Sequence, residues 1–443
     1  MHPLLRLAAA AMLALLLLAP ARAQEDAAIA VATSEARPDF PRSISFELAA
    51  EAAGADIAAV QLLYGTTRSG ALTVVDLPVT PGPRVEVSHT LDTRVYYFPP
   101  GTELTYRWAI TDADGDEQTT EPQTMVYHDE RFSWSELSER NVTVYWYRGG
   151  ADFGRELMDV TTRTLDRLQR QVGADLDAPV RIYIYADTTD MRSALQSNSV
   201  EWVGGQAHPE LGIIIGAIAP GDSAEAQRLI PHELSHQVLH QATANPYGGT
   251  PIWFDEGLAV HNQEQRDIGW DEMVAEAAVA GTLIPLEALA GSFPADTERA
   301  LLSYAQSRDV VEFIVATYGE GALRELVAAF AAATPADEAL PAVLGVTVDE
   351  LDAAWRATLP PQTGEPPTVA GPQSAPPERF EDRPPPDPAL GQGAGIGLAE
   401  RLAALPAWAS VAALALCCVA LAGAGGAALL VGLRLLGVDK RTG

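Results

Sequence analysis

Cysteine and lysine are almost absent from this chain of 443 residues. The two cysteines, Cys417 and Cys418, are adjacent and lie in an apolar run, which excludes a disulfide framework and a cysteine-rich zinc site. Basic side chains are also scarce: 29 Lys and Arg residues face 59 Asp and Glu residues, which leaves a formal net charge of −30. Such a field repels phosphate backbones, so we expect no nucleic acid among the partners.

Sequence patterns of several large enzyme classes are missing as well. There is no phosphate-binding G-x-x-x-x-G-K-[ST] loop, no G-x-G-x-x-G dinucleotide fingerprint and no G-x-S-x-G nucleophile elbow. The chain is too long for one ordinary domain, and its 47% hydrophobic and 20% charged residues are typical of globular proteins. We therefore expect two or three units without nucleotide or serine-hydrolase chemistry.

Both ends of the chain carry membrane-related signals. Residues 1–23 have the basic start, short apolar run and small-x-small cleavage pattern of a signal peptide, with a retained anchor as the alternative. Residues 407–433 form an uncharged apolar run long enough for a transmembrane helix, with a buried core helix as the alternative. Basic residues follow this run, so residues 434–443 are expected to be a cytoplasmic tail. These signals predict a single-pass protein of the cell membrane whose N-terminal ectodomain lies outside the cytoplasm.

The ectodomain is expected to hold two folded parts and a linker. Residues 360–406 are rich in proline and then in glycine, and such a composition cannot bury a core. Residues 27–130 predict an all-β sandwich domain, because short apolar runs are separated by turn residues. The predicted strands are Ser43–Leu48, Ala59–Tyr64, Leu72–Leu77, Arg84–Leu91, Leu104–Thr111 and Thr124–Tyr127. Asp114-Gly115 is expected to be a hairpin turn, because a calcium loop would need Gly and Glu where Glu117 and Gln123 stand.

The second folded part, residues 140–359, predicts an α+β domain. Strands come first and the chain then becomes helical almost to Leu359. The predicted elements are strands Asn141–Tyr147, Val180–Tyr185 and Leu211–Ile218 and a helix within Phe153–Val172. Thr347 and Glu350 have the spacing of a capping box, which predicts the start of the last helix.

One motif in this part carries recognisable chemistry. His232-Glu233-Leu234-Ser235-His236 is an H-E-x-x-H pattern, and on a helix its two histidines share one face. Both imidazoles can therefore bind one zinc ion, while Glu233 can accept a proton from a zinc-bound water. Two packed structural histidines are the alternative when the motif is taken alone. Pro231 precedes the motif, and we expect the helix to begin there because proline fits the first turn.

A second segment, W-F-D-E-G-L-A at positions 253–259, follows at a compatible distance. At this point the chain resembles the gluzincins, zinc metalloproteases of the peptidase MA type. The resemblance implies a zincin-like fold in which His232, His236 and Glu256 bind zinc and Glu233 is the general base. Asp255 is the alternative third ligand. His240 is too far along the helix to share the ion with His232 and is expected to support the site or to pack.

Other residues have weaker assignments. Related gluzincins use a Tyr or His after the third ligand to stabilise the oxyanion, and Tyr304 is the candidate here, with a buried structural tyrosine as the alternative. The run from Gly212 to Gly216 is either an edge strand that binds substrate by β-addition or an interior strand. The G-x-M-E-N loop of the related aminopeptidases is missing, so endopeptidase action is favoured. His208 and His261 are expected to be structural.

Two functions follow from these observations. The first is a membrane-tethered, extracytoplasmic zinc metallopeptidase that hydrolyses peptides or proteins through a zinc-bound water activated by Glu233. The alternative is a cell-surface binding or adhesion protein that carries an inactive peptidase-like module.

Overall fold

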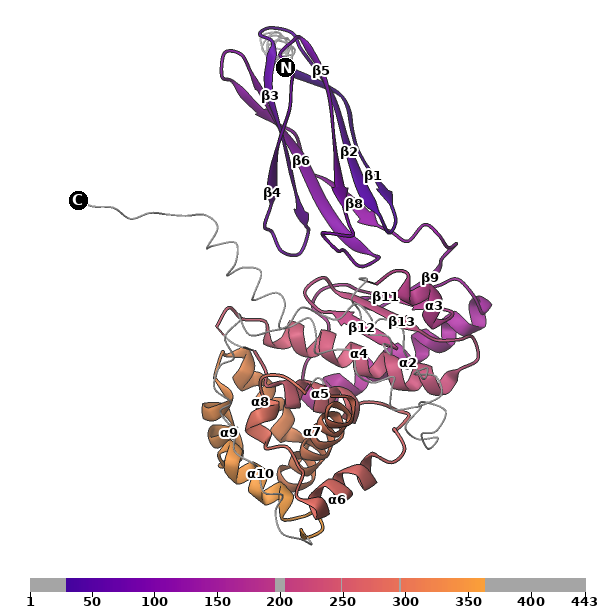
Figure 1. The fold of residues 1–443 in the computed structure, drawn as a ribbon, viewed down its shortest axis with the longest axis vertical. Helices are drawn as coiled ribbons and strands as arrows, with labels where there is room; N and C mark the ends of the chain where they lie inside the picture. The colour runs from indigo at the N-terminus through magenta and orange to yellow at the C-terminus, as the bar shows by residue number, and fades with distance from the viewer. Residues whose placement is uncertain (1–28, 196–203, 248, 295, 363–443) are drawn as a thin grey trace, which may run out of the picture.

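The computed structural model describes residues 29–195, 204–247, 249–294 and 296–362 (Figure 1). Two β sheets come first in the chain, a third sheet follows, and helices make up most of the rest. No helix of these described ranges has the length and the apolar character needed to cross a membrane. The predicted signal peptide, the transmembrane helix at 407–433, the tail and nearly all of the linker lie outside the described residues.

The N-terminal β region, residues 29–127, consists of two sheets with a shared core. One sheet has the order β1-β2-β5, and the other has the order β4-β3-β6-β7, with β8 also paired to β6. Phe46 of β2 stacks on Tyr64 of β3 with ring centroids 5.6 Å apart, so the two sheets pack face to face. The strands are β1 Ile29–Asp39, β2 Ser43–Ala52, β3 Ile57–Thr66, β4 Thr73–Leu77, β5 Arg84–Asp92, β6 Thr102–Asp112, β7 Glu117–Thr119 and β8 Gln123–Tyr127.

All six strands predicted in this region are present, and two were missed. Strand β1 lies at the edge of its sheet and is mostly exposed, so its sequence lacks a regular apolar alternation. Strand β7 has only three residues. The predicted turn at Asp114-Gly115 is confirmed: Gly115 has a φ of 93°, and its N–H donates to the Asp112 carbonyl at 3.2 Å.

A third sheet joins the β region to the helices. Its order is β12-β13-β11-β10-β9, with β10, β11 and β13 parallel and the two outer strands antiparallel. In β11, Ile182 and Ile184 belong to the core under the helices, whereas Tyr183 and Tyr185 belong to the core of the β region. Both faces of this sheet are therefore covered, as Figure 1 shows. The strands are β9 Ser135–Glu139, β10 Val142–Trp146, β11 Val180–Tyr185, β12 Gly205–His208 and β13 Ile213–Ala217.

The helices other than the short α3, Thr188–Arg192, lie on the side of this sheet opposite the β region, whereas Met191 of α3 belongs to the β-region core (Figure 1). Helix α2, Gly150–Val172, has the predicted apolar stripe and buries Leu157, Leu165 and Leu168. The last helix begins with the predicted Thr347–Glu350 capping box. The remaining helices are α4 Ser223–Thr243, α5 Ile252–His261, α6 Trp270–Ala280, η1 Leu286–Leu289, α7 Thr297–Tyr318, α8 Glu320–Ala331, α9 Ala336–Leu344 and α10 Val348–Arg356.

The prediction that the motif helix begins at Pro231 is wrong. Helix α4 starts eight residues earlier, at Ser223, where the Asp222 side chain accepts from the N–H of Glu225 at 3.1 Å. Pro231 lies inside the helix and lacks the backbone N–H that would donate a hydrogen bond to the carbonyl of Gln227, four residues earlier. That carbonyl instead accepts from the backbone N–H groups of Glu264 and Gln265 at 2.9 and 3.3 Å. The loop after α5 thus replaces the hydrogen bond that proline removes.

Candidate metal centre

Two imidazoles of helix α4 face one point. His232 and His236 are one turn apart, and their Nε2 atoms lie 3.4 Å from each other. Both residues are buried, with 4% and 5% of their surface exposed. Burial, and then the nearby charges of His236 and Arg228, hold the pKa of His232 well below its usual range. His232 is therefore neutral at physiological pH, which is the form that binds metals.

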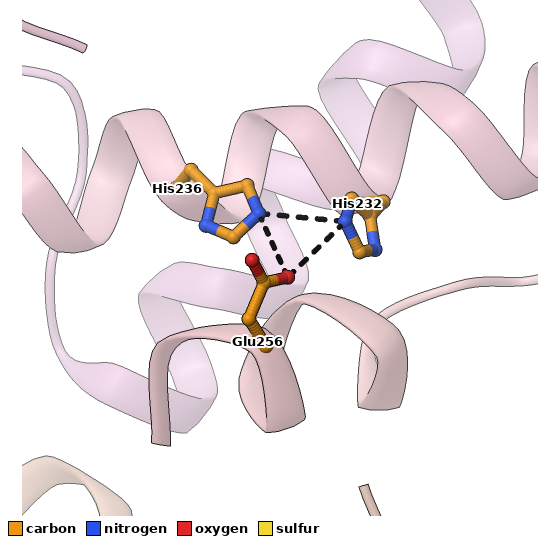
Figure 2. Close-up of side chains that lie close together, drawn as sticks. All are labelled: His232, His236 and Glu256. Atoms are coloured by element: carbon orange, nitrogen blue, oxygen red, sulfur yellow. Dashed lines mark hydrogen bonds and ion pairs between the residues drawn. The ribbon is translucent and has the colours of Figure 1, made fainter. Parts of the chain in front are cut away.

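Helix α5 brings a carboxylate to the same point. Glu256 Oε2 lies 3.6 Å from His232 Nε2 and 3.5 Å from His236 Nε2, and Figure 2 shows the three side chains converging. The position of α5 depends on Gly257, because a Cβ there would lie 2.4 Å from the Ser307 carbonyl oxygen of α7. Any larger residue at position 257 would push α5 and its carboxylate away from α7.

Hydrogen bonds on the outer side of each imidazole fix its orientation. Asp255 Oδ1 lies 2.7 Å from His236 Nδ1, and the Gln263 amide nitrogen lies 3.2 Å from His232 Nδ1. Asp255 therefore contacts the nitrogen of His236 that faces away from Glu256, so it is not part of the converging donor set. The Asp255 carboxylate can accept from Nδ1–H of His236, which leaves the opposite nitrogen free for an ion. An amide nitrogen only donates, so Gln263 would act in the same way on His232 by turning its amide oxygen, which has no partner among the described residues, toward Nδ1–H.

The donor set fits a zinc ion. The ligand atoms of His232, His236 and Glu256 all lie within 4.8 Å of one another, and all three residues are buried. Tetrahedral ligands at about 2.0–2.2 Å from zinc are separated by roughly 3.3–3.6 Å, which is the range of the three distances here. Two imidazoles and one carboxylate are also a known catalytic zinc set, with the fourth position left for a reactant.

Glu233 lies behind this donor set, against the edge strand β12. A Cβ at Gly205 would lie 2.9 Å from Glu233 Oε1, and the backbone N–H of Ala207 donates to the same carboxylate. Burial raises the pKa of Glu233 to about 7, and the charges of His236 and Arg228 oppose that rise. A carboxyl group with a pKa near neutrality can both accept and return a proton.

Tyr304 of α7 lies beside the third donor. It is fully buried, and its ring packs edge-to-face on Phe293 at 5.0 Å. Burial raises the pKa of Glu256, whereas the charge of His236 and hydrogen bonds from His236 and from the Tyr304 hydroxyl oppose that rise. The tyrosine predicted from its order in the chain therefore reaches the site, where it contacts the carboxylate of Glu256.

The other histidines that the sequence singled out lie elsewhere. His240 is exposed on α4, so the expectation that it packs or supports the site is wrong. His208 of β12 is buried, with its ring 6.1 Å from that of Tyr97 in the β region. His261 lies 3.6 Å from a carboxylate oxygen of Glu312. None of these three is among the donors that converge with Glu256.

The site contains residues that sequence reasoning missed. Arg228 lies one turn before His232, is held by Glu225 through hydrogen bonds of 2.9 and 2.6 Å, and places a buried positive charge near Glu233. Gln263 lies just beyond the end of α5, in a loop whose path no local pattern specifies, so the sequence carried no signal for it. No sequence signal pointed to Gly205, because its role depends on how strand β12 packs against α4.

Comparison with known proteins bears on the same part of the chain. Residues 160–360 match the family model of the Peptidase MA superfamily, which confirms the resemblance that the two motifs predicted. No curated protein matches the chain.

Likenesses to solved structures are weak. An aminopeptidase N family protein from Idiomarina loihiensis is similar with a TM-score of 0.31 and 11% identity, over 71% of this chain and 68% of that one. A polysaccharide deacetylase from Bacillus cereus is similar with a TM-score of 0.18 and 9% identity, over 37% of this chain and 52% of that one. The chain thus spans about half the length of this deacetylase. At such low scores neither likeness supports an argument about fold or function.

Proposed function

Because residues 160–360 match the Peptidase MA superfamily, we propose that this chain is a zinc metallopeptidase that cleaves peptides or proteins as an endopeptidase. The observation that carries the proposal is the convergence of three buried donors, with Glu233 on the neighbouring position of the same helix. His232, His236 and Glu256 would hold the ion. When bound, zinc supplies Lewis-acid chemistry that polarises a carbonyl group and makes water more acidic.

Glu233 would accept the proton of the attacking water and return it to the leaving amine. A carboxylate at this position is suited to both transfers, because it can accept a proton and return it. Asp255 would accept from His236 Nδ1–H and leave Nε2 free for the ion, and the Gln263 amide would do the same for His232 through its oxygen. Tyr304, predicted as the oxyanion donor, lies beside Glu256 and could instead orient that carboxylate.

The edge strand β12 would bind the substrate backbone. The N–H of Ala217 donates to the Gly204 carbonyl, so the ladder's alternation turns the backbone groups of Gly205 and Ala207 away from β13. Since the Ala207 N–H donates to Glu233, the Gly205 N–H and the two carbonyl groups are those that would bind a substrate. Strand β13 is an interior strand, so the run from Gly212 to Gly216 is not the edge strand that would bind substrate. Strand β12 lies at that edge of the sheet and would take this role instead. Antiparallel or parallel addition of an extended peptide there would place its scissile bond near Glu233.

Membrane tethering outside the cytoplasm is part of the proposal and rests on the sequence alone. Residues 1–23 and 407–433 carry the signals for it. A protease added to intact cells should remove the ectodomain; an ectodomain degraded only after lysis would contradict this orientation.

Two variants test the enzymatic proposal. Glu233→Gln keeps the size of the side chain but cannot accept a proton, so cleavage of a mixed peptide library should fall by at least about 100-fold while zinc content stays near one per chain. Glu256→Ala should lose most of the zinc and the activity together. Cleavage that survives Glu233→Gln would contradict the mechanism. A folded, zinc-supplied wild-type chain without zinc would instead favour the surface binding protein with an inactive module.

A further inference from the structure

A cavity of about 210 Å³ lies between the N-terminal β region and the third sheet, away from the donor set. The β region contributes Thr67, Arg68 and Glu103 to its lining. Strand β11 contributes Arg181, and the segments just before β11 and β13 contribute Pro179 and Leu211. This volume is many times that needed for one water molecule, about 10–15 Å³ on the same measure. The cavity can therefore hold a small organic molecule.

Arg68 reaches across the boundary and has donors to spare. Its guanidinium donates to the Pro179 carbonyl, and Gly212 makes room for it, because a Cβ there would overlap the Arg68 guanidinium. Within the described ranges, no carboxylate lies within 4.0 Å of this guanidinium, although a guanidinium has five N–H groups. Arg68 also remains partly exposed, so a ligand can reach it from solvent.

The charges in the cavity leave an excess of one positive charge. Arg181 forms an ion pair with Glu103 at 2.8 Å, and Arg68 adds a second guanidinium. Burial, and then the charge of Arg181, lower the pKa of Arg68, and the charge of Glu103 opposes this. This excess occurs in a chain whose formal net charge is −30.

We propose that this cavity binds a small monocarboxylate, whose charge would match the single positive excess and whose two oxygens would accept from Arg68. A guanidinium presents parallel N–H groups that match a carboxylate. Leu211 and Pro179 provide an apolar wall for a short aliphatic body. The carboxylate can belong to a free short-chain acid or to the C-terminus of a peptide.

Such a ligand would contact both regions of the molecule. Leu211 belongs to the turn between β12 and β13, and β12 is the strand that contacts Glu233. Binding would thus stabilise the contact between the β region and the hairpin next to the proposed metal centre. The proposal concerns a different cavity from the proposed active site, so its test needs no peptide cleavage.

Calorimetric titration of the full-length protein tests this site. Sodium butyrate should bind saturably at one site, and butyramide, which has the same size without the charge, should not. N-acetyl-dialanine and its C-terminal amide separate the two sources: binding of the peptide acid as tight as that of butyrate would indicate a site for chain ends. No heat with either acid, or equal binding of the acid and the amide, would overturn the proposal.

Three variants locate the binding. Arg68→Met should weaken butyrate binding by at least about tenfold, because a charge-assisted pair of hydrogen bonds is lost. Arg94→Met is the matched control: it removes an exposed arginine of the same region, paired with Asp92 at 2.6 Å, and should leave the affinity unchanged. Glu103→Gln raises the cavity charge and should strengthen binding. Equal losses in the two arginine variants, or a Glu103→Gln variant that binds no tighter, would contradict the assignment.

Discussion

Glycine at position 205 allows strand β12 to lie in contact with Glu233, and this close approach can be tested. A methyl group at Gly205 would meet Glu233 Oε1 at 2.9 Å and side-chain atoms of Leu229 at 3.0 Å. We expect Gly205→Ala to displace the Glu233 carboxylate and to lower kcat by about tenfold or more, since small displacements of a catalytic group are costly. Zinc content should stay unchanged, and peptide cleavage with elemental analysis measures both.

The residue opposite provides the control. Gly216 pairs with Gly205 across β12 and β13, but the three atoms nearest to a Cβ there all belong to Leu229, the first at 2.7 Å. Gly216→Ala should therefore lower the free energy of unfolding without a specific loss of kcat. Equal effects on kcat from both variants would show that Glu233 is not the group that Gly205 accommodates.

The contact between Tyr304 and Glu256 gives a second prediction for a single residue. Tyr304→Phe keeps the buried ring on Phe293 and removes only the hydroxyl that reaches Glu256. If the hydroxyl orients this ligand, zinc affinity should fall about 10- to 100-fold, and activity should return at saturating zinc. Competition with a chelator measures the affinity. A loss of kcat of about 100-fold that persists at saturating zinc would instead identify Tyr304 as the oxyanion donor.

Spacing in the chain predicted the donors of the site better than it predicted their supports. His232 and His236 are one helical turn apart, so any helix places them together. Glu256 required the resemblance, because a position twenty residues away can lie anywhere until α5 is known to cross α4. Gly205 depends on the placement of a four-residue edge strand, and no local pattern specifies that placement.

Strand β12 depends on a buried histidine, and this should make the hairpin it forms with β13 sensitive to acid. His208 is 5% exposed, and burial lowers its pKa to about 4. His208 takes up a proton near pH 6.5 in the unfolded chain but only near pH 4 in the folded chain. The free energy of unfolding therefore falls as the pH drops from about 6.5 to about 4. The loss from this group amounts to at most about 3 kcal/mol.

Urea unfolding at pH 7.5 and pH 4.5 measures this effect. His208→Leu should lose less stability between the two pH values than the wild-type chain does, because leucine takes up no proton. His240→Leu removes a histidine from an exposed position and should behave like the wild type. A His208→Leu chain with the wild-type pH dependence would contradict this interpretation.

Elements with a strong internal pattern were predictable, and those defined by their neighbours were not. Strand β11 was predicted with its observed ends, because five of the six residues in V-R-I-Y-I-Y are β-branched or aromatic. Helix α2 was predicted from its apolar stripe. Helix α4 was cut short at Pro231, because the sequence does not show that a distant loop supplies donors to the Gln227 carbonyl.

One buried carboxylate lies in the segment that connects the β region to the third sheet. Asp129 is fully buried, and its side chain accepts from Arg131 at 2.6 and 2.8 Å and from the Tyr185 hydroxyl at 2.7 Å. Asp129→Ala would leave the buried Tyr185 hydroxyl without its acceptor, while the partly exposed Arg131 can turn to solvent, and should cost about 1–3 kcal/mol. Calorimetric unfolding should then show the β region melting separately from the helices.

An exposed ion pair of the same region is the control for Asp129. Asp39 pairs with Arg42 at 2.8 Å, and both side chains are more than half exposed. Asp39→Ala should therefore leave the unfolding profile close to that of the wild-type chain. A single wild-type-like transition in Asp129→Ala would show that other contacts suffice to join the two regions.

The proline inside α4 helps to bring the three proposed metal ligands together before a metal ion binds. The loop after α5 binds the Gln227 carbonyl, and the same loop carries Gln263 to His232. The helix of the two histidines and the helix of Glu256 are thereby joined by protein contacts alone. The conformational entropy cost of bringing the three ligands together is then incurred when the chain folds, before a metal ion binds. A metal ion would enter a site that is already ordered, and little of its binding free energy would be spent on organising the chain.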